Sequence, residues 1–534
     1  MPHAINPVFR TSSTSFTFFP WMDYFSVATP TPYDTMERIA EQAGELGIDY
    51  SGNKFGFHFP ASVTIFGKSM PCYIIHHHAT HAACTYYLSG MRSAAVMTTD
   101  GGSGLERGGW WSYGSGNQLY PIAPHYLEVG GIYAQTAKAV LRLGSSADGK
   151  MMGLAPYGSP SLFDEKLVGN AFDYDVLAKN GEFPFAEEKR YAWERFVRER
   201  IPTLGYDLST FGDPDSPLDA VNADLAASVQ RIFEATLMKA ARATADLFER
   251  RGLRVDGLCL AGGSMLNCPT NTLIYQSGLF GDLFVPPFTD DSGCAIGAAL
   301  WVYHNLLGFS LVERSAILPA DPYLGNLWAA ESRLAGRPSS RALSIEHVEA
   351  AAIACARDIA SNKIVAWYEG RSEIGPRALG HRSILADARI ADNWRRVNLA
   401  KQRATWRPFA PAVLKEHASD YFEGAPPNSP YMLFNARLKR KDLPAVTHVD
   451  GTSRIQTVTR ENGLFHTALS EFHKLTNCPV VMNTSLNGPG EPIVETPEQA
   501  LQFIGNGYAD VLYLDGVRIA PVEMAAREAQ GLVQ

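Results

Sequence analysis

Short apolar runs that end in Gly or Asp recur along the chain, and each is typical of a buried strand that leads into a turn. They lie at 94–102, 255–263, 363–370, 478–485 and 509–516. Segments with helical periodicity lie between them. Residues 222–252 keep apolar positions three and four apart up to Gly252, and 31–47 has Pro and Asp near its start. Strands that alternate with helices predict an α/β architecture.

The chain has 534 residues, which is too long for one hydrophobic core. The segment 331–350 is polar and rich in small residues, so we expect one domain over 1–340 and a second over 341–534. A net charge of −8 gives no overall reason to expect nucleic-acid binding. No apolar run approaches the length of a membrane span, and the start lacks the order of a signal peptide. The seven cysteines form no CxxC pair, which favours a cytoplasmic protein without a zinc ribbon or disulfide framework.

Histidines occupy four of the six positions from 76 to 81. On a helix, His77 and His81 share one face with Cβ atoms about 5–6 Å apart, so both imidazoles can reach one cation. His78 and His81 are three apart, and they are a weaker alternative pair of metal ligands. The segment lacks the glutamate of HExxH, which excludes a zincin protease. Taken alone, such histidines are more often packed residues than metal ligands.

Two aspartates favour the metal interpretation. Asp100 ends the predicted strand "AAVMTTD", and Asp291, in "PPFTDDSGCAIGAAL", precedes a helix start rich in small residues. Two imidazoles and two carboxylates suit Fe, Mn or Zn with open positions for a substrate. Instead of binding a metal, each aspartate could cap a helix or a turn. Asp290 is the alternative metal ligand to its neighbour Asp291.

The turn "LAGGSMLNCPTN" follows a predicted strand and precedes a predicted helix. Backbone N–H groups at such a turn can hold a phosphate or adenosine, although many strand–helix turns contain paired glycines. The candidate nucleotide-binding residues here are Gly262, Gly263 and Asn267.

Residues 371–407 contain nine Lys or Arg against three Asp or Glu. A solvated basic face or a nucleic-acid patch would explain this charge. The cations alternate with turn residues, however, and the apolar "PFAPAVL" follows them, which favours a folded anion pocket. Arg binds planar anions through two parallel hydrogen bonds, and Lys supplies a point charge.

Several motifs together resemble the NodU/CmcH-type O-carbamoyltransferases, a family that includes the tobramycin carbamoyltransferase. They are "HHATHAA", "TTDGGSG", "DGKMMGLAPYG", "LAGGSMLNCPTN", "DDSGCAIGAA", "GPRALGHRSILADAR", "KQRATWRPFAPAVL" and "NTSLNGPGEPIVETPEQAL". The resemblance runs from about residue 35 to the end. It implies a TsaD-like domain with the actin/Hsp70-type (ASKHA, duplicated RNase H-like) fold over 1–340 and a YrdC-like α/β domain over 341–534. It also implies a metal, commonly iron, bound by His77, His81, Asp100 and Asp291.

The same resemblance implies a two-step reaction. The second domain would form carbamoyl-adenylate from carbamoyl phosphate and Mg²⁺-bound ATP, and the first would transfer the carbamoyl group to a hydroxyl of a small-molecule acceptor, as in antibiotic and other natural-product biosynthesis. By motif, the phosphates would be held by Lys401 and Arg403, Asn483 and Ser485, and Arg377. The residues implied to be catalytic are His77, His81, Asp100, Lys401 and Arg403.

Two alternatives stay open. A tRNA threonylcarbamoyl-type enzyme is disfavoured by the acidic charge and the lack of an added RNA-binding module; a hydrogenase-maturation enzyme would show CxxC pairs, which are absent. The family usually begins with a strand, a glycine turn and a second strand, yet residues 1–30 match nothing similar and no Gly precedes Gly44. Different chemistry could replace the hairpin, or a second protein could supply it. The chain could also be a nucleotide-binding subunit that is active only with a partner, and a homodimer is a further expectation for its assembly.

Overall fold

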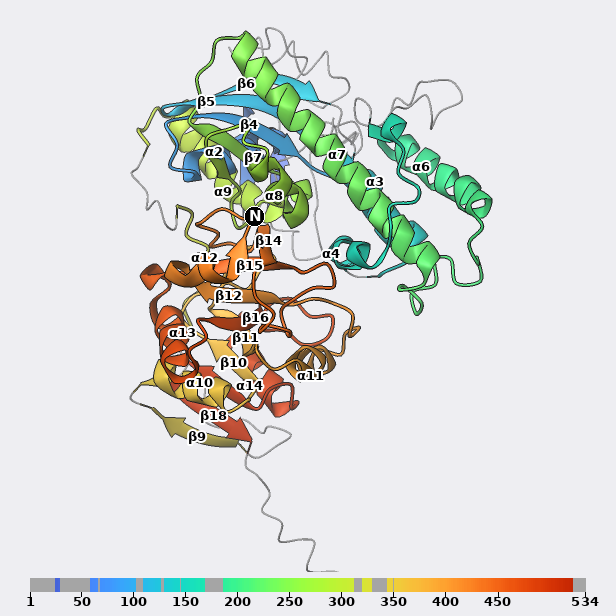
Figure 1. Cartoon of the computed structure of the whole chain (residues 1–534). Helices are drawn as coiled ribbons and strands as arrows, with labels where there is room; N and C mark the ends of the chain where they lie inside the picture. The colour runs from blue at the N-terminus through green and yellow to red at the C-terminus, as the bar shows by residue number, and fades with distance from the viewer. Residues whose placement is uncertain are drawn as a thin grey trace, which may run out of the picture. The chain divides into compact units, whose positions relative to one another are not determined.

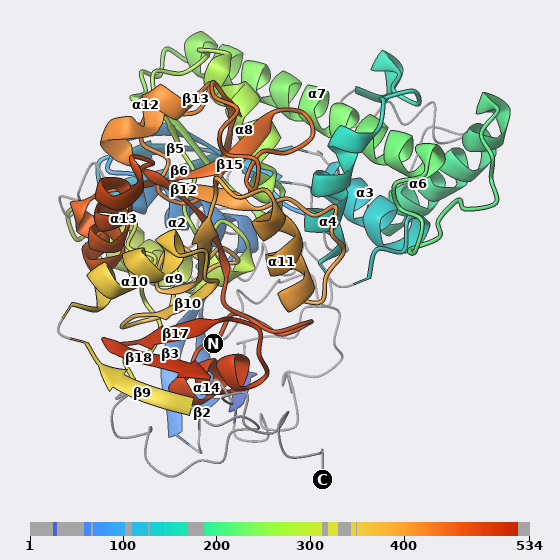
Figure 2. The same ribbon diagram turned by 60° about the horizontal axis from the view of Figure 1, so that its bottom comes forward.

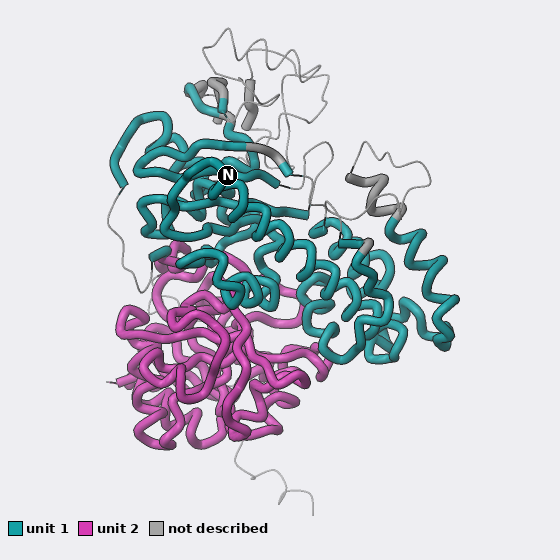
Figure 3. Tube along the Cα trace, turned by 45° about the horizontal axis from the view of Figure 1, so that its top comes forward, with its two compact units in different colours: residues 1–320 teal, residues 321–534 magenta. Residues whose placement is uncertain are grey.

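The computed structural model describes residues 25–28, 58–65, 68–101, 109–125, 129–144, 146–168, 186–311, 319–328, 343–348 and 350–521. The chain divides into two compact units, residues 1–320 and 321–534 (Figure 3). The division precedes the predicted boundary at 340 because the segment 321–328 packs with the second unit. There the Tyr323 hydroxyl donates to the Leu379 carbonyl (3.0 Å) and the Trp328 indole N–H to Glu495 (3.0 Å). The predicted helix at 31–47 and most of residues 1–30 lie outside the described residues.

The N-terminal unit contains a five-stranded sheet with the order β6-β5-β4-β7-β8 and a three-stranded sheet with the order β1-β2-β3. In the larger sheet β7 pairs in parallel with both β4 and β8, and the β4-β5 and β5-β6 pairs are antiparallel. The strands are β1 (Phe25–Ala28), β2 (His58–Ile65), β3 (Lys68–Ile75), β4 (Ser93–Thr99), β5 (Gly109–Ser115), β6 (Gln118–His125), β7 (Gly257–Ala261) and β8 (Leu283–Phe284). The α-helices are α2 (His77–Leu88), α3 (Val129–Gln135), α4 (Ala147–Leu154), α6 (Ala186–Arg200), α7 (Ala220–Arg250), α8 (Cys268–Gln276) and α9 (Cys294–Leu300).

Helices cover both faces of β4, which explains why this strand is apolar and almost wholly buried. Successive residues of a strand point to opposite faces. On one face the Thr244 hydroxyl of α7 donates to the Met97 sulfur (3.7 Å), and on the other His78 of α2 lies 3.2 Å from the Thr98 hydroxyl. The long helix α7 is prominent in Figure 1 and confirms the helix predicted at 222–252, while β4 and β7 confirm two predicted strands.

The C-terminal unit is built on a ten-stranded mixed sheet with the order β13-β14-β15-β12-β16-β11-β10-β17-β18-β9. Its strands are β9 (Leu343–His347), β10 (Val365–Tyr368), β11 (Arg382–Asp387), β12 (Ala410–Leu414), β13 (Phe422–Glu423), β14 (Phe434–Leu438), β15 (Thr452–Val458), β16 (Val480–Ser485), β17 (Val511–Leu514) and β18 (Val517–Pro521). Its α-helices are α10 (Ala351–Ala360), α11 (Asp392–Ala400), α12 (Ala418–Tyr421), α13 (Gly463–Thr476) and α14 (Pro497–Gly505). The strands β10, β16 and β17 confirm the remaining three predictions, and the expected mixed α/β class is confirmed for both units.

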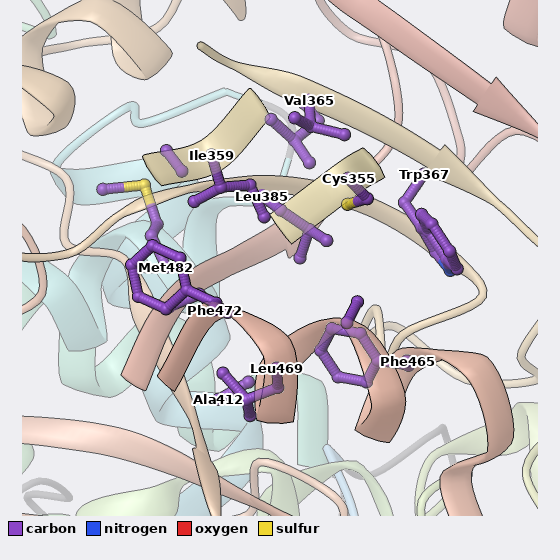
Figure 4. Packing of buried hydrophobic residues seen from close by; sticks show 14 of the residues in the cluster. Cys355, Ile359, Val365, Trp367, Leu385, Ala412, Phe465, Leu469, Phe472 and Met482 are labelled. Carbon is purple, nitrogen blue, oxygen red and sulfur yellow. The ribbon is translucent and has the colours of Figure 1, made fainter. Parts of the chain in front are cut away.

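The core of this unit lies between the sheet and its helices. Figures 1 and 2 show α10 and α13 on one side of the sheet and α11 and α14 on the other. Figure 4 shows how residues of α10 and α13 meet residues of the central strands. The labelled residues are Cys355, Ile359, Val365, Trp367, Leu385, Ala412, Phe465, Leu469, Phe472 and Met482. Within the described part of the chain, no helix combines the length and apolar character needed to cross a membrane.

Candidate metal and anion sites

The helix α2 brings the two predicted histidines together. Its first residue is His77, and the His78 backbone N–H donates to His76 Nδ1 (3.2 Å) at the cap. One turn apart, His77 and His81 have Nε2 atoms 3.2 Å from each other. His78 is turned toward Thr98 and buried, so it does not join the pair.

Asp100 completes one side of this pair. It follows β4, and its Oδ1 accepts from the backbone N–H groups of Gly101 (2.7 Å) and Gly263 (3.0 Å). These bonds fix the carboxylate so that Oδ2 lies 3.0 Å from His77 Nε2 and 3.8 Å from His81 Nε2. The strand end therefore aims a carboxylate at the imidazoles, as the sequence predicts.

Asp291 approaches the same two histidines from the short 3₁₀ turn that precedes α9. Its Oδ1 lies 3.4 Å from His81 Nε2 and 3.6 Å from His77 Nε2. Asp290 caps the turn instead, because its Oδ1 accepts from the Ser292 N–H (3.1 Å). The structure thus distinguishes Asp291 from its competitor.

Two glycines explain how this turn reaches α2. A Cβ on Gly297 would lie 1.8 Å from the Thr80 carbonyl oxygen of α2. A Cβ on Gly293 would lie 2.8 Å from the Cys84 sulfur of α2. Only glycine allows this close approach, so the small residues that follow Asp291 bring α9 against α2.

The donor set fits a divalent metal ion. Metal–nitrogen and metal–oxygen bonds of about 2.0–2.2 Å place neighbouring ligand atoms roughly 3.0–3.5 Å apart. The imidazole nitrogens of His77 and His81 lie 3.0–3.8 Å from the carboxylate oxygens of Asp100 and Asp291, which is close to that range. Nitrogen and oxygen donors together suit Fe, Mn or Zn.

The cluster is strongly coupled electrostatically. Burial and the neighbouring His81 lower the pKa of His77, but hydrogen bonds to Asp100 and Cys294 outweigh them and raise it to about 10. Burial raises the pKa of Asp100, but its hydrogen bonds to the two histidines hold it well below its usual value. The carboxylates thus attract positive charge to this position, whether on protons or on a metal ion.

The sequence analysis missed Cys294, which lies in the same cluster. Its Sγ is 3.7 Å from His81 Nε2 and 3.8 Å from His77 Nδ1, and the thiol is buried. One donor atom from each of His77, His81, Asp291 and Cys294 lies within 4.8 Å of all the others. Burial raises the pKa of Cys294, but His81 and His77 outweigh it and bring it to about 6. Its position three residues after Asp291, at a helix start, was the available signal.

The glycine turn contributes to this centre through Asp100. Gly262 has φ of 100°, and a Cβ there would lie 2.2 Å from the Thr99 carbonyl oxygen. Its N–H donates to the Thr289 carbonyl (2.8 Å), and that of Gly263 donates to Asp100. Both N–H groups are therefore used within the chain, and nucleotide binding by this turn stays a prediction.

Asn267 is engaged in a buried amide network. Its Oδ1 accepts from the backbone N–H of Thr270 (3.2 Å), which caps α8. Its amide also pairs with that of Gln230 on α7 through bonds of 3.0 and 2.9 Å. The side chain therefore joins α8 to α7, and its predicted contact with nucleotide stays untested.

Four cations gather in the C-terminal unit. The ammonium group of Lys401 donates to the Ser485 carbonyl (2.5 Å) and to Asn487 Oδ1 (2.7 Å), and burial, then Arg403 and Arg407, lower its pKa well below the usual value. Burial, Arg407 and Arg454 likewise lower the pKa of Arg403. We call Lys401, Arg403, Arg407 and Arg454 the cation cluster. Two of its members, Arg407 and Arg454, were not named from the sequence as ligands.

The cation cluster has no carboxylate partner among the described residues. The ion pairs of this unit use other cations, such as Arg389 with Asp387 (2.7 Å) and Arg518 with Asp358 (2.9 Å). The Arg454 Nε is buried without a hydrogen-bond partner. Buried charges are costly unless they are paired, so the cluster is suited to bind an anion.

Strand register explains how distant residues meet here. Asn483 of β16 pairs with Ala410 of β12, and Ala412 pairs with Gln456 of β15. Paired residues share one face of a sheet, as do residues two apart on a strand, so Asn483 and Arg454 project to the same side.

The predicted residues Asn483 and Arg377 are linked through the loop before β11. The Asn483 amide donates to Gln456 Oε1 (2.8 Å) and to the carbonyl of Ala378 (3.3 Å), the residue that follows Arg377. Asn483 Oδ1 is buried without a partner. Ser485 lies two residues further along β16, beside Lys401. The structure thus brings all five predicted anion-binding positions to one region of the unit.

Known proteins were compared with the chain. Residues 54–300 match a family described as carbamoyltransferase N-terminus, and residues 356–520 match carbamoyltransferase C-terminus. Nodulation protein NolO of Bradyrhizobium diazoefficiens is 34% identical over 85% of this chain and 79% of its own length. Nodulation protein U of Sinorhizobium fredii is 33% identical over 75% of this chain and 67% of its own length. A crystal structure of full-length HypF in the phosphate- and nucleotide-bound form matches 32% of this chain and 22% of that chain, at 19% identity and a TM-score of 0.25, which is too low to compare folds.

Proposed function

Because the chain belongs to the carbamoyltransferase family of the NodU/NolO type, we propose that it is an ATP-dependent O-carbamoyltransferase that acts on a small-molecule alcohol. In this proposal the C-terminal unit is the YrdC-like domain that makes carbamoyl-adenylate. The N-terminal unit is the TsaD-like, actin/Hsp70-type domain that transfers the carbamoyl group.

The cation cluster is the observation that carries the proposal. Carbamoyl phosphate yields carbamate and phosphate by hydrolysis, and a carbamate oxygen then attacks the α-phosphorus of Mg²⁺-bound ATP. Pyrophosphate leaves, and carbamoyl-adenylate forms. Developing charge on phosphate oxygens requires fixed positive groups nearby. Lys401, Arg403, Arg407 and Arg454 offer four such groups without competing carboxylates among the described residues.

In the second step the acceptor hydroxyl attacks the carbamoyl carbon, and AMP leaves. His77, His81, Asp100 and Asp291 would hold a divalent metal, iron by the family resemblance, which when bound supplies Lewis-acid polarisation of oxygen. The bonds from Gly101 and Gly263 keep the Asp100 carboxylate oriented. The Asp291 side chain is 62% exposed, so an acceptor approaches the cluster most easily there. His78 is 2% exposed and faces Thr98, so we assign it no proton transfer.

Pyrophosphate release tests the proposal. Purified protein with Mg²⁺, ATP and carbamoyl phosphate should release pyrophosphate, and omission of carbamoyl phosphate should abolish the release. Lys401→Met should abolish it as well, whereas Arg389→Gln, which removes a cation paired with Asp387, should retain it. ATP turnover at an equal rate without carbamoyl phosphate would contradict the mechanism.

The acceptor class needs a separate assay. Sugars, aminoglycosides, nucleosides and polyketide alcohols are incubated with both donors, and carbamoylated product is detected by mass spectrometry. Product from tRNA, with salt-sensitive tRNA binding, would instead favour the threonylcarbamoyl alternative. Product that forms only with an added partner protein would support the alternative in which that partner supplies the N-terminal hairpin.

A further inference from the structure

Cys294 is the one donor of the N-terminal cluster that the proposed two-histidine, two-aspartate centre does not use. It is the first residue of α9, three positions after Asp291, so both side chains point to the same side of the turn. The glycine contacts that bring α9 against α2 carry its sulfur to the histidines. The thiol is 3% exposed, and its Sγ lies 3.7 Å from His81 Nε2.

This separation agrees with two atoms that share a metal ion. A metal–sulfur bond of about 2.3 Å and a metal–nitrogen bond of about 2.0–2.1 Å place tetrahedral ligands roughly 3.5–3.6 Å apart. The Sγ also lies 3.8 Å from His77 Nδ1, which is the ring nitrogen on the side away from Asp100. A sulfur that only accepts a hydrogen bond from the His77 Nδ1–H would show the same 3.8 Å contact. A test must therefore distinguish a metal ligand from a hydrogen-bond acceptor.

We propose that Cys294 is a sulfur ligand of the metal, which makes the centre a mixed site of imidazole, carboxylate and thiolate. The inference rests on the metal centre proposed above and extends it. Thiolate is a softer donor than carboxylate and favours zinc, or cobalt in its place, over manganese. The sulfur would also release a proton when the metal binds.

Cobalt binding tests this ligand directly. Metal-free wild-type protein is titrated with Co²⁺, and cobalt content and the near-ultraviolet absorption spectrum are measured together. The wild type should bind cobalt with a thiolate-to-cobalt charge-transfer band. Cys294→Ser should lose the band and bind cobalt at least about tenfold more weakly. Cys84→Ser is the matched control, because Cys84 is also buried and near Gly293 but lies outside the donor cluster.

X-ray absorption of zinc-loaded wild type provides a second measurement that needs no variant, should Cys294→Ser fail to fold. One sulfur scatterer at about 2.3 Å supports the proposal. Bound metal with only nitrogen and oxygen neighbours would overturn it, leave the metal centre intact and assign Cys294 to holding His77. A band that persists in Cys294→Ser also overturns it. Wild-type protein that binds no metal would reject the centre itself, and the ligand assignment with it.

Discussion

Replacing Arg407 by Gln tests whether the cation cluster is an anion site. The Arg407 guanidinium makes no ion pair in the described part of the chain, and it lowers the pKa of both Lys401 and Arg403. Its backbone carbonyl accepts from the side chains of Trp394 (2.7 Å) and Asn398 (3.1 Å), and these bonds survive the substitution. The change therefore removes a charge without removing a structural bond.

The expected effects on stability and binding have opposite signs. Repulsion between neighbouring charges in a partly buried site is on the order of 1–2 kcal/mol, so Arg407→Gln should leave the free protein at least as stable as the wild type. A hydrogen bond from a guanidinium to a phosphate contributes about 1.5–3 kcal/mol, so pyrophosphate should bind roughly tenfold to a hundredfold more weakly.

Isothermal calorimetry with pyrophosphate and urea unfolding without it measure the two quantities. Arg389→Gln is the control, because it breaks the pair with the fully buried Asp387 carboxylate. It should lower stability and leave pyrophosphate affinity unchanged. Unchanged pyrophosphate affinity in Arg407→Gln, or a loss of stability as large as that of the control, would refute the reasoning.

Three further substitutions address other parts of the structure. His81→Ala should strip most metal from the purified protein, as measured by elemental analysis; full metal content with full transfer activity would contradict the site. Gly297→Ala should cost about 1–3 kcal/mol in urea unfolding and weaken Co²⁺ binding, because its Cβ would lie 1.8 Å from the Thr80 carbonyl oxygen. Burial raises the pKa of Glu369 from 4.5 to about 7. The folded state thus binds this proton more tightly than the unfolded state, and stability should fall by roughly 1–3 kcal/mol as pH rises through that window. Glu369→Gln should flatten this part of the pH profile.

Local patterns place the candidate metal-binding residues of the N-terminal unit close together, because Asp100 follows a strand and Asp291 lies in the turn before a helix. The spacing of His77 and His81 fixes their common face on α2, and Asp100 follows a strand whose apolar run is evident. Cys294 was missed because its role depends on the approach of α9 to α2. That approach is set by contacts between residues over 200 positions apart, such as Gly297 with Thr80, which no local pattern reports.

The C-terminal site shows the same limit more clearly. The density of Lys and Arg in 371–407 predicts an anion pocket, and Lys401 and Arg403 lie in the cation cluster. Arg454 lies some fifty residues further along the chain in β15, where its neighbours in sequence are unremarkable. Only the register of β16, β12 and β15 puts Arg454 on the same face as Asn483. Cross-strand register depends on the whole sheet, so sequence alone could not identify this residue.

The electrostatics of the two sites explain why the proposed reaction needs both. The cation cluster repels any divalent metal ion that lacks a phosphate to accompany it, while the carboxylates of Asp100 and Asp291 repel free phosphates. Formation of an adenylate requires the first environment, because negative charge develops on phosphate oxygens. Polarisation of a hydroxyl or carbonyl requires the second, because its carboxylates, imidazoles and the Cys294 sulfur are the donors that would retain a Lewis-acidic metal. In the proposed reaction each step therefore has its own electrostatic environment, with adenylate formation at the cation cluster and carbamoyl transfer at the residues that would bind the metal.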